Sequence, residues 1–439
     1  MKFDSRGARG SGQARLALAA ATVLSLLVAA CSGATTSTAP SAAAGSAAPG
    51  SSTAAVSGEC NIPYDASILD HRTIPASLDP AVSHPDISQM AANNTSGLMG
   101  SLPDVAPVWF DSIKITPDQV QQICAKHLKA VYLDWADALY NQIFRSAMRQ
   151  TLSAMGINLI RITSFSFDPN GLAGNLASVL PLKPDIIFTG GTIDTKQYAS
   201  LMQPAVDAGI KIISWGVGAD GWETGQGKQI TTLVGYDWYA LGQQMAIAVH
   251  NQYPNGATLG WLHWINNIKV IALREQGFLD GLKAYPNIKI VSDGGPPDPA
   301  GTNSGYSDPN AAQATTQAFI LKHPEVNVLF APWEDPPALG EEAAIKSTNN
   351  VGKIDIVTMD LGTAGAGELV DPNGTIKVDM AQDIFDGGRI ESIAAGLDAI
   401  GAPVPPYIIV PTFATTKANL KDAWDFMHGP EFPCPVANC

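Results

Sequence analysis

Short apolar runs alternate with stretches of helical spacing from residue 129 onward, and this alternation predicts an α/β protein. Apolar runs of strand length are typical of buried parallel strands, whereas apolar residues three and four positions apart indicate a helix. We expect strands at residues 130–135, 158–165, 185–189 and 211–215, and helices at 139–155, 172–182 and 198–208. The short connections favour a parallel sheet that is covered by helices on both faces.

A second set of the same elements follows. We expect helices at residues 241–253, 270–284, 311–322 and 338–347, and strands at 258–264, 288–291, 328–330 and 354–359. Two sets predict two doubly wound parallel-sheet lobes, whose ligand binds in a cleft beyond the carboxyl ends of the strands. Before them, Thr116 and Pro117 predict the start of a helix to His127, and residues 59–115 show no clear periodicity.

Aromatic and acidic residues gather at the predicted carboxyl ends of the strands. The tryptophans are Trp135, Trp215, Trp264 and Trp333, and the nearby carboxylates are Asp134, Asp137, Glu334, Asp335 and Asp360. Flat aromatic faces stack on sugar rings or hold cations, and carboxylates accept hydrogen bonds from hydroxyl or ammonium groups. Each tryptophan alone could be a core residue, but four at equivalent places indicate a binding cleft.

The N-terminus has the pattern of an export signal. Lys2, Arg6, Arg9 and Arg15 precede the apolar residues 16–28, and small residues lead to Cys31. This order resembles the bacterial lipobox, which implies that residues 1–31 are a lipoprotein signal and that Cys31 receives the lipid anchor. The alternatives are an ordinary signal peptide or a short anchor helix. Residues 32–58 carry no charge and are expected to form a flexible tether.

The charge balance limits the partners. The 439 residues include 26 basic and 40 acidic ones, and the formal net charge is −14. Nucleic acid and anionic lipid surfaces are therefore not expected to bind the body of the chain. Past residue 31, the sequence contains no apolar run of about 18 residues or more, which a membrane-spanning helix needs.

Four cysteines follow the lipobox, namely Cys60, Cys124, Cys434 and Cys439. An even number outside the cytoplasm favours two disulfides, for which three connectivities are possible, one of them with a local Cys434–Cys439 pair. A zinc site is the alternative, but no CxxC pattern or histidine cluster supports it. We therefore expect no metal.

Several motifs stand in a fixed order between Lys129 and about Leu420. They are Val234-Gly235-Tyr236-Asp237 with Gly242, the stretch Arg274-Glu275-Gln276-Gly277-Phe278, Trp333-Glu334-Asp335 with Ala338-Leu339-Gly340, the strand that leads to Asp360, and Met380-Ala381-Gln382. The ordered set resembles the type I periplasmic solute-binding proteins, in particular the ribose- and galactose-type sugar receptors of ABC importers.

The resemblance implies a domain organisation. Residues 59–127 would be an N-terminal extension. Residues 128–236 and 383–411 would form the N-terminal lobe, and residues 237–382 and 412–439 the C-terminal lobe and tail. Three crossovers would form the hinge of this Venus-flytrap fold.

The resemblance also implies site residues. Arg274 would donate paired hydrogen bonds to ligand oxygens, Asp360 would accept from hydroxyls, and Gln382 would serve both ligand and hinge. Tyr140, with Asn141 beside it, and Tyr306 fall where the family places stacking aromatics. Packing is the alternative for Tyr140 and Tyr306, a helix cap for Asp360 and a surface ion pair for Arg274.

Two departures from the family pattern bear on the ligand. Many sugar-binding members carry Asp-Arg where this chain has Gly216 and Val217, and Glu334 replaces the usual Asn. Trp215 precedes the first departure, so the sequence predicts a more aromatic and more acidic pocket. A cationic or amino-bearing ligand, or a larger glycoside, is therefore an alternative to a simple sugar.

We expect an extracytoplasmic, lipid-anchored and monomeric receptor that binds a small polar, sugar-like ligand and delivers it to an ABC permease. The alternatives are a cationic or aromatic ligand, or a sensor for a membrane kinase. No convincing Gly-x-Ser-x-Gly, HExxH, P-loop or paired catalytic carboxylates were found, so we predict neither an enzyme nor a cofactor. The related repressors share the fold but need an N-terminal helix-turn-helix.

Overall fold

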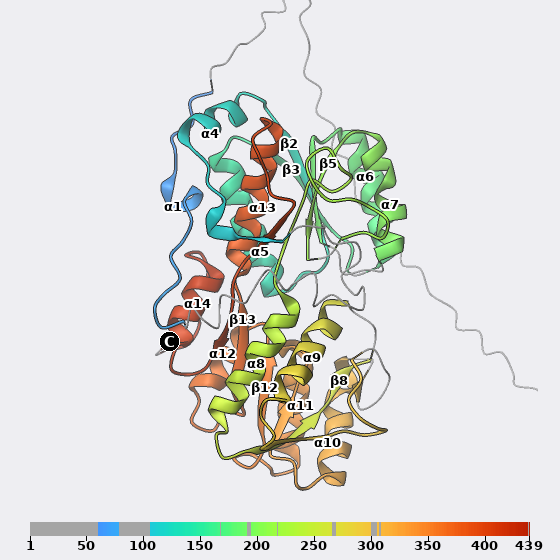
Figure 1. The fold of residues 1–439 in the computed structure, drawn as a ribbon, viewed down its shortest axis with the longest axis vertical. Helices are drawn as coiled ribbons and strands as arrows, with labels where there is room; N and C mark the ends of the chain where they lie inside the picture. Colours follow the sequence, from blue (N-terminus) through green and yellow to red (C-terminus); the bar gives the residue numbers. More distant parts are fainter. Residues whose placement is uncertain are drawn as a thin grey trace, which may run out of the picture. The chain divides into compact units, whose positions relative to one another are not determined.

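Two parallel β-sheets organise the chain (Figure 1). The computed structural model describes residues 60–78, 106–166, 168–190, 195–216, 218–265, 269–299, 305–306, 309–437 and 439. All of them lie in one compact unit, Ser57–Cys439. The predicted signal segment, Cys31, the tether and Val217 lie outside the described residues.

Seven strands of the described residues form the first sheet, in the order β1-β14-β6-β5-β4-β2-β3, and every neighbouring pair is parallel. The strands are β1 (Val108–Trp109), β14 (Tyr407–Ile409), β6 (Thr232–Gly235), β5 (Lys211–Trp215), β4 (Ile186–Gly190), β2 (Lys129–Asp134) and β3 (Asn158–Ser164). In Figure 1, α6 (Pro169–Val179) and α7 (Thr195–Asp207) cover one face, and α5 (Leu139–Ala154) and α13 (Ile384–Ala399) cover the other.

The second sheet has the order β15-β13-β12-β11-β7-β9 within the described ranges. Its strands are β15 (Thr412–Thr415), β13 (Ile376–Gln382), β12 (Asp355–Met359), β11 (Val328–Phe330), β7 (Ala257–Trp261) and β9 (Ile288–Val291). Only the β13–β15 pair is antiparallel. Its helices are α8 (Trp238–Gln252), α9 (Lys269–Leu282), α10 (Ala312–Lys322), α11 (Leu339–Ser347), α12 (Thr363–Val370) and α14 (Leu420–His428). The predicted α/β class with two doubly wound sheets is confirmed.

The chain passes between the two sheets three times, at residues 236–237, 382–383 and 410–411. Backbone hydrogen bonds join the three crossing segments. The Val410 N–H donates to Gly235 O at 2.9 Å, and the Asp383 N–H donates to Pro411 O at 3.0 Å. The crossings therefore form one narrow bundle, as a hinge requires.

Glycines bring α8 and α9 into close contact, which places Arg274. A Cβ at Gly242 would lie 1.9 Å from Arg274 O, and a Cβ at Gly277 would lie 1.9 Å from Tyr239 O. Any larger residue at either glycine would push the helices apart. These glycines belong to the two motifs that the sequence analysis identified, and their role is backbone packing.

The prediction of one strand at residues 258–264 is wrong in its second half. β7 ends at Trp261. Its partner residue in the neighbouring strand β11 is Phe330, which is the last residue of that strand. β8 (His263–Trp264) then pairs with β10 (Gly305–Tyr306) in a separate two-stranded sheet. The ladder partner changes at Leu262, which a pattern of apolar residues alone does not reveal.

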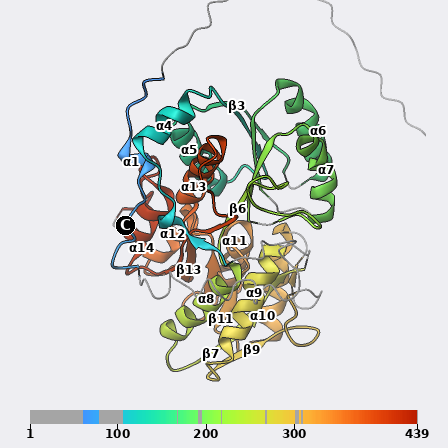
Figure 2. The ribbon, with the colours of Figure 1, turned by 45° about the horizontal axis from the view of Figure 1, so that its top comes forward.

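Part of the region without periodicity is ordered structure. α1 (Ala66–Leu69) lies near α13, and α4 (Pro117–Cys124) begins with a capping box of Thr116 and Gln119. Figure 2, turned from the first view, also shows α1 and α4 on the α13 side of the first sheet. None of the helices in the described ranges has the length and apolar character to cross a membrane.

Candidate functional site

Polar and aromatic residues follow four neighbouring strands of the second sheet. Gln382 ends β13, Asp360 follows β12, Trp333 follows β11, and Trp264 lies just beyond β7. These four strands are adjacent and parallel in the sheet, so their carboxyl ends meet at one edge. The sequence prediction that these side chains share an edge agrees with the strand order.

Arg274 of α9 is the centre of a hydrogen-bonded cluster at this edge. Its Nη1 lies 3.1 Å from Asp360 Oδ1, and its Nη2 donates to Gln382 Oε1 at 3.3 Å. Gln382 Nε2 also donates to Asp360 Oδ1. The Arg274 residue is only 5% exposed, and its Nε has no hydrogen-bond partner among the described residues. A buried donor without a partner is costly, which is typical of a functional position.

An aromatic ring supports the guanidinium of Arg274. The Arg274 Cζ lies 4.7 Å from the centre of the Trp238 ring. Trp238 begins α8 directly after the first crossing, and its Nε1 donates to Gly216 O at 3.4 Å. Such stacking holds the planar fork of an arginine in one orientation.

Tyr140 of α5, a helix on the first sheet, bonds to the first crossing. It lies in the first turn of α5, and its hydroxyl donates to the Tyr236 hydroxyl at 3.2 Å. Burial raises the pKa of Tyr140 well above its usual value, and the charges of Asp360 and Arg274 also act on it. The Tyr140 hydroxyl thus bonds to the first crossing, at Tyr236.

The backbone at Asp360 is strained. Asp360 has a φ of 95° and Leu361 a φ of 34°, although neither residue is glycine. The left-handed region costs such residues free energy, and it persists only where neighbouring contacts hold it. Strain of this kind is typical of binding sites, and the strained residue Asp360 is the one that pairs with Arg274.

Two buried carboxyl groups hold the strained segment. The Gly362 N–H donates to Glu334 Oε2, and the Leu361 N–H donates to Asp379 Oδ1 at 3.0 Å. A Cβ at Gly365 would lie 2.5 Å from both Glu334 Oε2 and Asp379 Oδ2, so these two oxygens are at most 5.0 Å apart. Glu334 is 3% exposed and bonds to the backbone next to the site, so its effect on the acidity of the cleft stays a prediction.

The pKa values of both buried carboxyl groups are raised. Burial and, after it, the charge of Glu334 raise the pKa of Asp379 well above its usual value. Burial also raises the pKa of Glu334. The protonated form is therefore favoured more strongly at Asp379 than at Glu334.

Asp379→Asn should change how stability depends on pH. Because the folded-state pKa of Asp379 is raised, its stabilising contribution is complete below the unfolded value of about 3.9 and is lost as the pH rises toward the folded pKa. The wild type should therefore lose up to about 1.4 kcal/mol of unfolding free energy per pH unit more than the variant. Urea unfolding between pH 4 and pH 8 measures both slopes.

The amide that Asp379→Asn introduces keeps the hydrogen bonds of a protonated carboxyl. The unfolding free energy of the variant should therefore rise relative to that of the wild type as the pH rises. Asp111→Asn, at an exposed carboxyl, is the control and should leave the slope unchanged. Parallel slopes for wild type and Asp379→Asn would contradict the raised pKa of Asp379.

Three aromatic residues form a second cluster at the same edge. The rings of Trp264 and Trp333 are 5.0 Å apart, and those of Trp264 and Tyr306 are 6.4 Å apart. Trp333 is partly exposed, and the Nε1 of Trp264 is buried without a partner in the described part of the chain. The Tyr306 hydroxyl donates to the buried Glu341 at 3.3 Å. Trp333 thus offers a face for stacking.

The other predicted aromatics are packed in the first sheet. Trp135 lies 5.6 Å from Phe144 and is 5% exposed, and Trp215 lies 5.1 Å from Phe144 and 5.1 Å from Tyr236 and is 3% exposed. Trp135 packs against Tyr140, and Trp215 packs against Tyr236. Trp135 and Trp215 therefore fit the alternative that a strand-end tryptophan is a core residue. Trp264 and Trp333 lie at the edge of the second sheet.

Asp137 and Asn141 have partners away from the Arg274 cluster. Asn141 Nδ2 donates to the buried Asp134 at 2.6 Å, and Asp137 Oδ1 pairs with Arg145 at 2.5 Å. Asp137, whose side chain is 71% exposed, borders an open cavity of about 700 Å³ that Arg145 and Glu431 also line. The structure therefore places both residues in a polar network of the first sheet.

Sequence reasoning missed Tyr236, Trp238 and Asp379. The two aromatics flank Asp237 in the first crossover motif, and an aromatic pair at a hinge could have identified them. Asp379 interrupts an apolar strand, which is itself a sign of a special role. Within the described ranges, no group of three or more His, Cys, Asp or Glu residues could hold a metal ion.

Comparison with known proteins identifies the fold. An ABC transporter solute-binding protein from Agrobacterium vitis, bound with alpha-D-tagatopyranose, has a TM-score of 0.58 at 20% identity over 69% of this chain and 99% of its own. A periplasmic solute-binding protein from Actinobacillus succinogenes 130z with bound D-allose has a TM-score of 0.57 at 20% identity over 67% and 99%. A 5-methylthioribose transporter protein from Thermotoga lettingae has a TM-score of 0.56 at 15% identity over 75% and 92%.

The sequence itself agrees with these structures. A comparison with curated protein sequences gives no significant match. The sequence profile of the periplasmic binding protein domain matches residues 119–390, which is more than half of the chain and includes the Arg274 cluster. The chain therefore belongs to the periplasmic binding protein domain family, as its motifs predicted.

Proposed function

We propose that this protein is the solute receptor of an ABC importer and that it binds a sugar or polyol between its two sheets. The main supporting observation is that Arg274, Asp360 and Gln382 form one hydrogen-bonded cluster at the edge of the second sheet. The charges of Arg274 and Asp360 also act on Tyr140 of α5. Hydroxyl groups of a sugar can both donate and accept, so they suit a cluster that offers a guanidinium and a carboxylate together.

The bound molecules of similar structures support this class of ligand. They are alpha-D-tagatopyranose, D-allose, allitol and 5-methylthioribose. The charges also favour a neutral ligand, because Arg274 already neutralises Asp360 and because Glu334 accepts a hydrogen bond from the Gly362 backbone. A cationic ligand would need a free carboxylate at the site.

The proposed mechanism is closure about the crossings. Residues 128–236 with 383–411 form one lobe, and residues 237–382 with 412–439 form the other. The ligand bonds to Arg274 and Asp360 of one lobe and to Tyr140 of the other, so it favours the closed form over the open form. A membrane permease then recognises the closed form. The protein is a binding protein and performs no chemistry.

We further propose that the protein is exported, that Cys31 carries a lipid, and that it acts as a monomer. Two disulfides are part of the same proposal. The Cα atoms of Cys60 and Cys124 are 5.7 Å apart, and those of Cys434 and Cys439 are 6.2 Å apart, both within the range of natural disulfides.

A thermal-shift panel on the soluble form, residues 59–439, tests the ligand class. D-Tagatose, D-allose, allitol and 5-methylthioribose represent sugars and polyols, and choline, glucosamine and adenosine represent the alternatives. A ligand at 100 times its Kd stabilises the folded state by about 2.7 kcal/mol, which raises Tm visibly. We expect a shift with at least one sugar or polyol. A shift with only choline or adenosine would overturn the sugar assignment.

A further inference from the structure

Residues 60–78 cross the molecule as an extended segment, which we call the strap. They precede the residues that match the family profile, which begins at residue 119. In Figure 1 the strap runs from α4 past α1 and α13 to α14. It therefore contacts elements on both sides of the crossings.

The first end of the strap is fixed to the helix α4. Cys60 lies within disulfide distance of Cys124, and Gln121 Nε2 donates to Ile62 O at 2.6 Å. The Tyr64 hydroxyl donates to Ile115 O at 3.0 Å. These contacts tie the strap to the same side as the first sheet, because α4 packs against α13.

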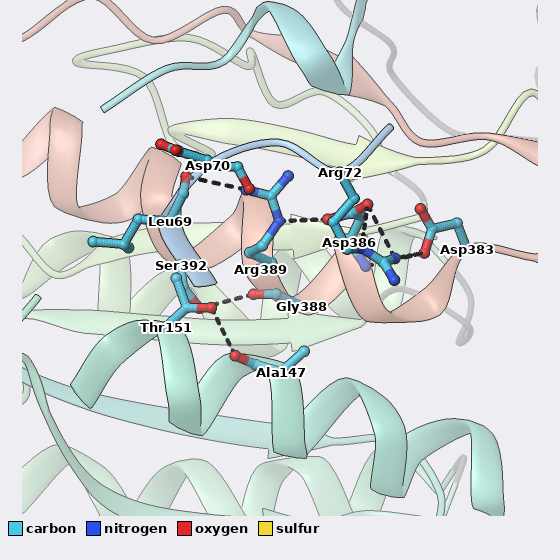
Figure 3. Close-up of polar contacts among 10 residues, drawn as sticks. All are labelled: Leu69, Asp70, Arg72, Ala147, Thr151, Asp383, Asp386, Gly388, Arg389 and Ser392. Atoms are coloured by element: carbon cyan, nitrogen blue, oxygen red, sulfur yellow. Dashed lines mark hydrogen bonds and ion pairs between the residues drawn. The ribbon is translucent and has the colours of Figure 1, made fainter. Parts of the chain in front are cut away.

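The middle of the strap binds the second crossing. Arg72 Nη2 lies 2.6 Å from Asp383 Oδ1 and 3.1 Å from Asp386 Oδ2, and both carboxylates are fully buried (Figure 3). Burial opposes ionisation of Asp386, but the guanidiniums of Arg72 and Arg389 outweigh it and hold the pKa of Asp386 well below its usual value. The Arg72–Asp386 ion pair is therefore present at neutral pH, whereas burial and the charge of Asp386 raise the pKa of Asp383 well above its usual value.

Two further contacts lock this junction. The Arg72 Cζ lies 4.7 Å from the ring centre of Phe385 and 4.4 Å from that of Phe426, so the guanidinium contacts aromatic rings of both α13 and α14. Arg389 Nη1 donates to Leu69 O at 3.3 Å and to Asp70 O at 3.0 Å. Figure 3 shows Asp386 between the two arginines.

The second end of the strap reaches α14. The Ser77 hydroxyl donates to Asp422, and Leu78 is fully buried. α14 contacts β13 and β15, which belong to the second sheet, and it also contacts α13 of the first. The strap thus joins α4 on one side of the crossings to α14 on the other.

We propose that the strap restrains the hinge and that Arg72 is a positioning residue for the ligand site. Asp383, which Arg72 holds, follows Gln382 directly in the chain, and Gln382 bonds to both Asp360 and Arg274. A change in the backbone at residues 382–383 moves the Gln382 amide relative to its two partners. The ligand step rests on the proposed function, whereas the restraint of the hinge does not.

The test compares four forms of residues 59–439 without ligand: wild type, Arg72→Met, Arg72→Lys and His71→Ala. Hydrogen exchange of the peptide that covers residues 380–390 measures the crossing. Nitroxide labels at Ala177→Cys on α6 and Leu321→Cys on α10, both exposed, measure the distance distribution across the crossings. His71 is the exposed neighbour of Arg72 and is the matched control.

In Arg72→Met we expect amide exchange in the crossing to be about tenfold faster or more, and the distance distribution to be wider. Arg72→Lys keeps one charged contact but lacks the fork, so it should lie between Arg72→Met and wild type. His71→Ala should match wild type. If Arg72→Met fails to fold, Asp383→Asn, whose amide still caps α13, should show the same changes in weaker form.

Wild-type exchange and distances in Arg72→Met would overturn the proposal. A lower Tm with an unchanged distance distribution would also overturn it, because Arg72 would then be a local brace of α13. Neither measurement needs a ligand. If no sugar or polyol of the thermal-shift panel binds but Arg72→Met has the wider distance distribution, the proposed function is overturned and the restraint of the hinge is supported.

Discussion

Replacing Arg274 by alanine should lower the affinity of the protein for its sugar or polyol by about 3 kcal/mol, roughly a hundredfold in Kd. Arg274 supplies the guanidinium at the centre of the site, and its Nε is a buried donor that no described residue satisfies. The variant also leaves the Asp360 carboxylate without its cation. Isothermal titration with the best ligand of the thermal-shift panel measures the loss.

The fold should survive this change, because Arg274 bonds to site residues and because the packing of α8 against α9 depends on Gly242 and Gly277. Circular dichroism and urea unfolding check this. Arg161→Ala, at an exposed position of β3, is the control for loss of an arginine and should bind normally. An Arg274→Ala variant with wild-type affinity would remove Arg274 from the site.

The Cys60→Ser/Cys124→Ser double variant should lose about 4 kcal/mol of unfolding free energy. The two cysteines are separated by 64 residues in the sequence, and a crosslink over such a separation removes much conformational entropy from the unfolded chain. The double change avoids a free thiol. Urea unfolding under oxidising conditions gives the difference.

The second cysteine pair is the matched control. Cys434 and Cys439 are separated by only five residues, so the Cys434→Ser/Cys439→Ser variant should lose about 2 kcal/mol at most. Equal losses for the two pairs would contradict the entropic account. Mass spectrometry of the unreduced protein, with no decrease of mass by four hydrogens, would contradict the disulfides themselves.

The sequence allowed the two sheets to be predicted because their strands are short apolar runs with short connections. An apolar run of this length is typical of a buried parallel strand. Short connections through helices then imply that successive strands are parallel and belong to one sheet. The break at Leu262 escaped this reasoning. It depends on where the neighbouring strand β11 ends, and residue 330 is far from residue 262 in the sequence.

The site residues that lie within the family motifs could be predicted from the sequence. The motifs pointed to Arg274, Asp360 and Gln382, which the structure brings together. Glu334 shows the limit of this reasoning. A carboxylate at a strand end can face the ligand or the backbone beneath it, and only the position of Asp379 decides between the two.

The strap could not be predicted at all. Its contacts link Arg72 to Asp383 and Asp386, more than 300 residues away, and no periodicity marks residues 60–78. A single arginine in such a segment reads as a surface charge. Its two buried partners follow the Gln382 of the hinge motif, but their pairing depends on tertiary structure alone.

The contact between Trp264 and Trp333 provides the protein with an optical signal of its own. The two indoles are 5.0 Å apart, and their planes are inclined at 66°. Aromatic chromophores so close and so inclined couple their electronic transitions, which produces a paired band in the circular dichroism spectrum. A ligand that stacks on the partly exposed Trp333 would alter this band, so occupancy of the cleft can be followed by spectroscopy without any attached dye.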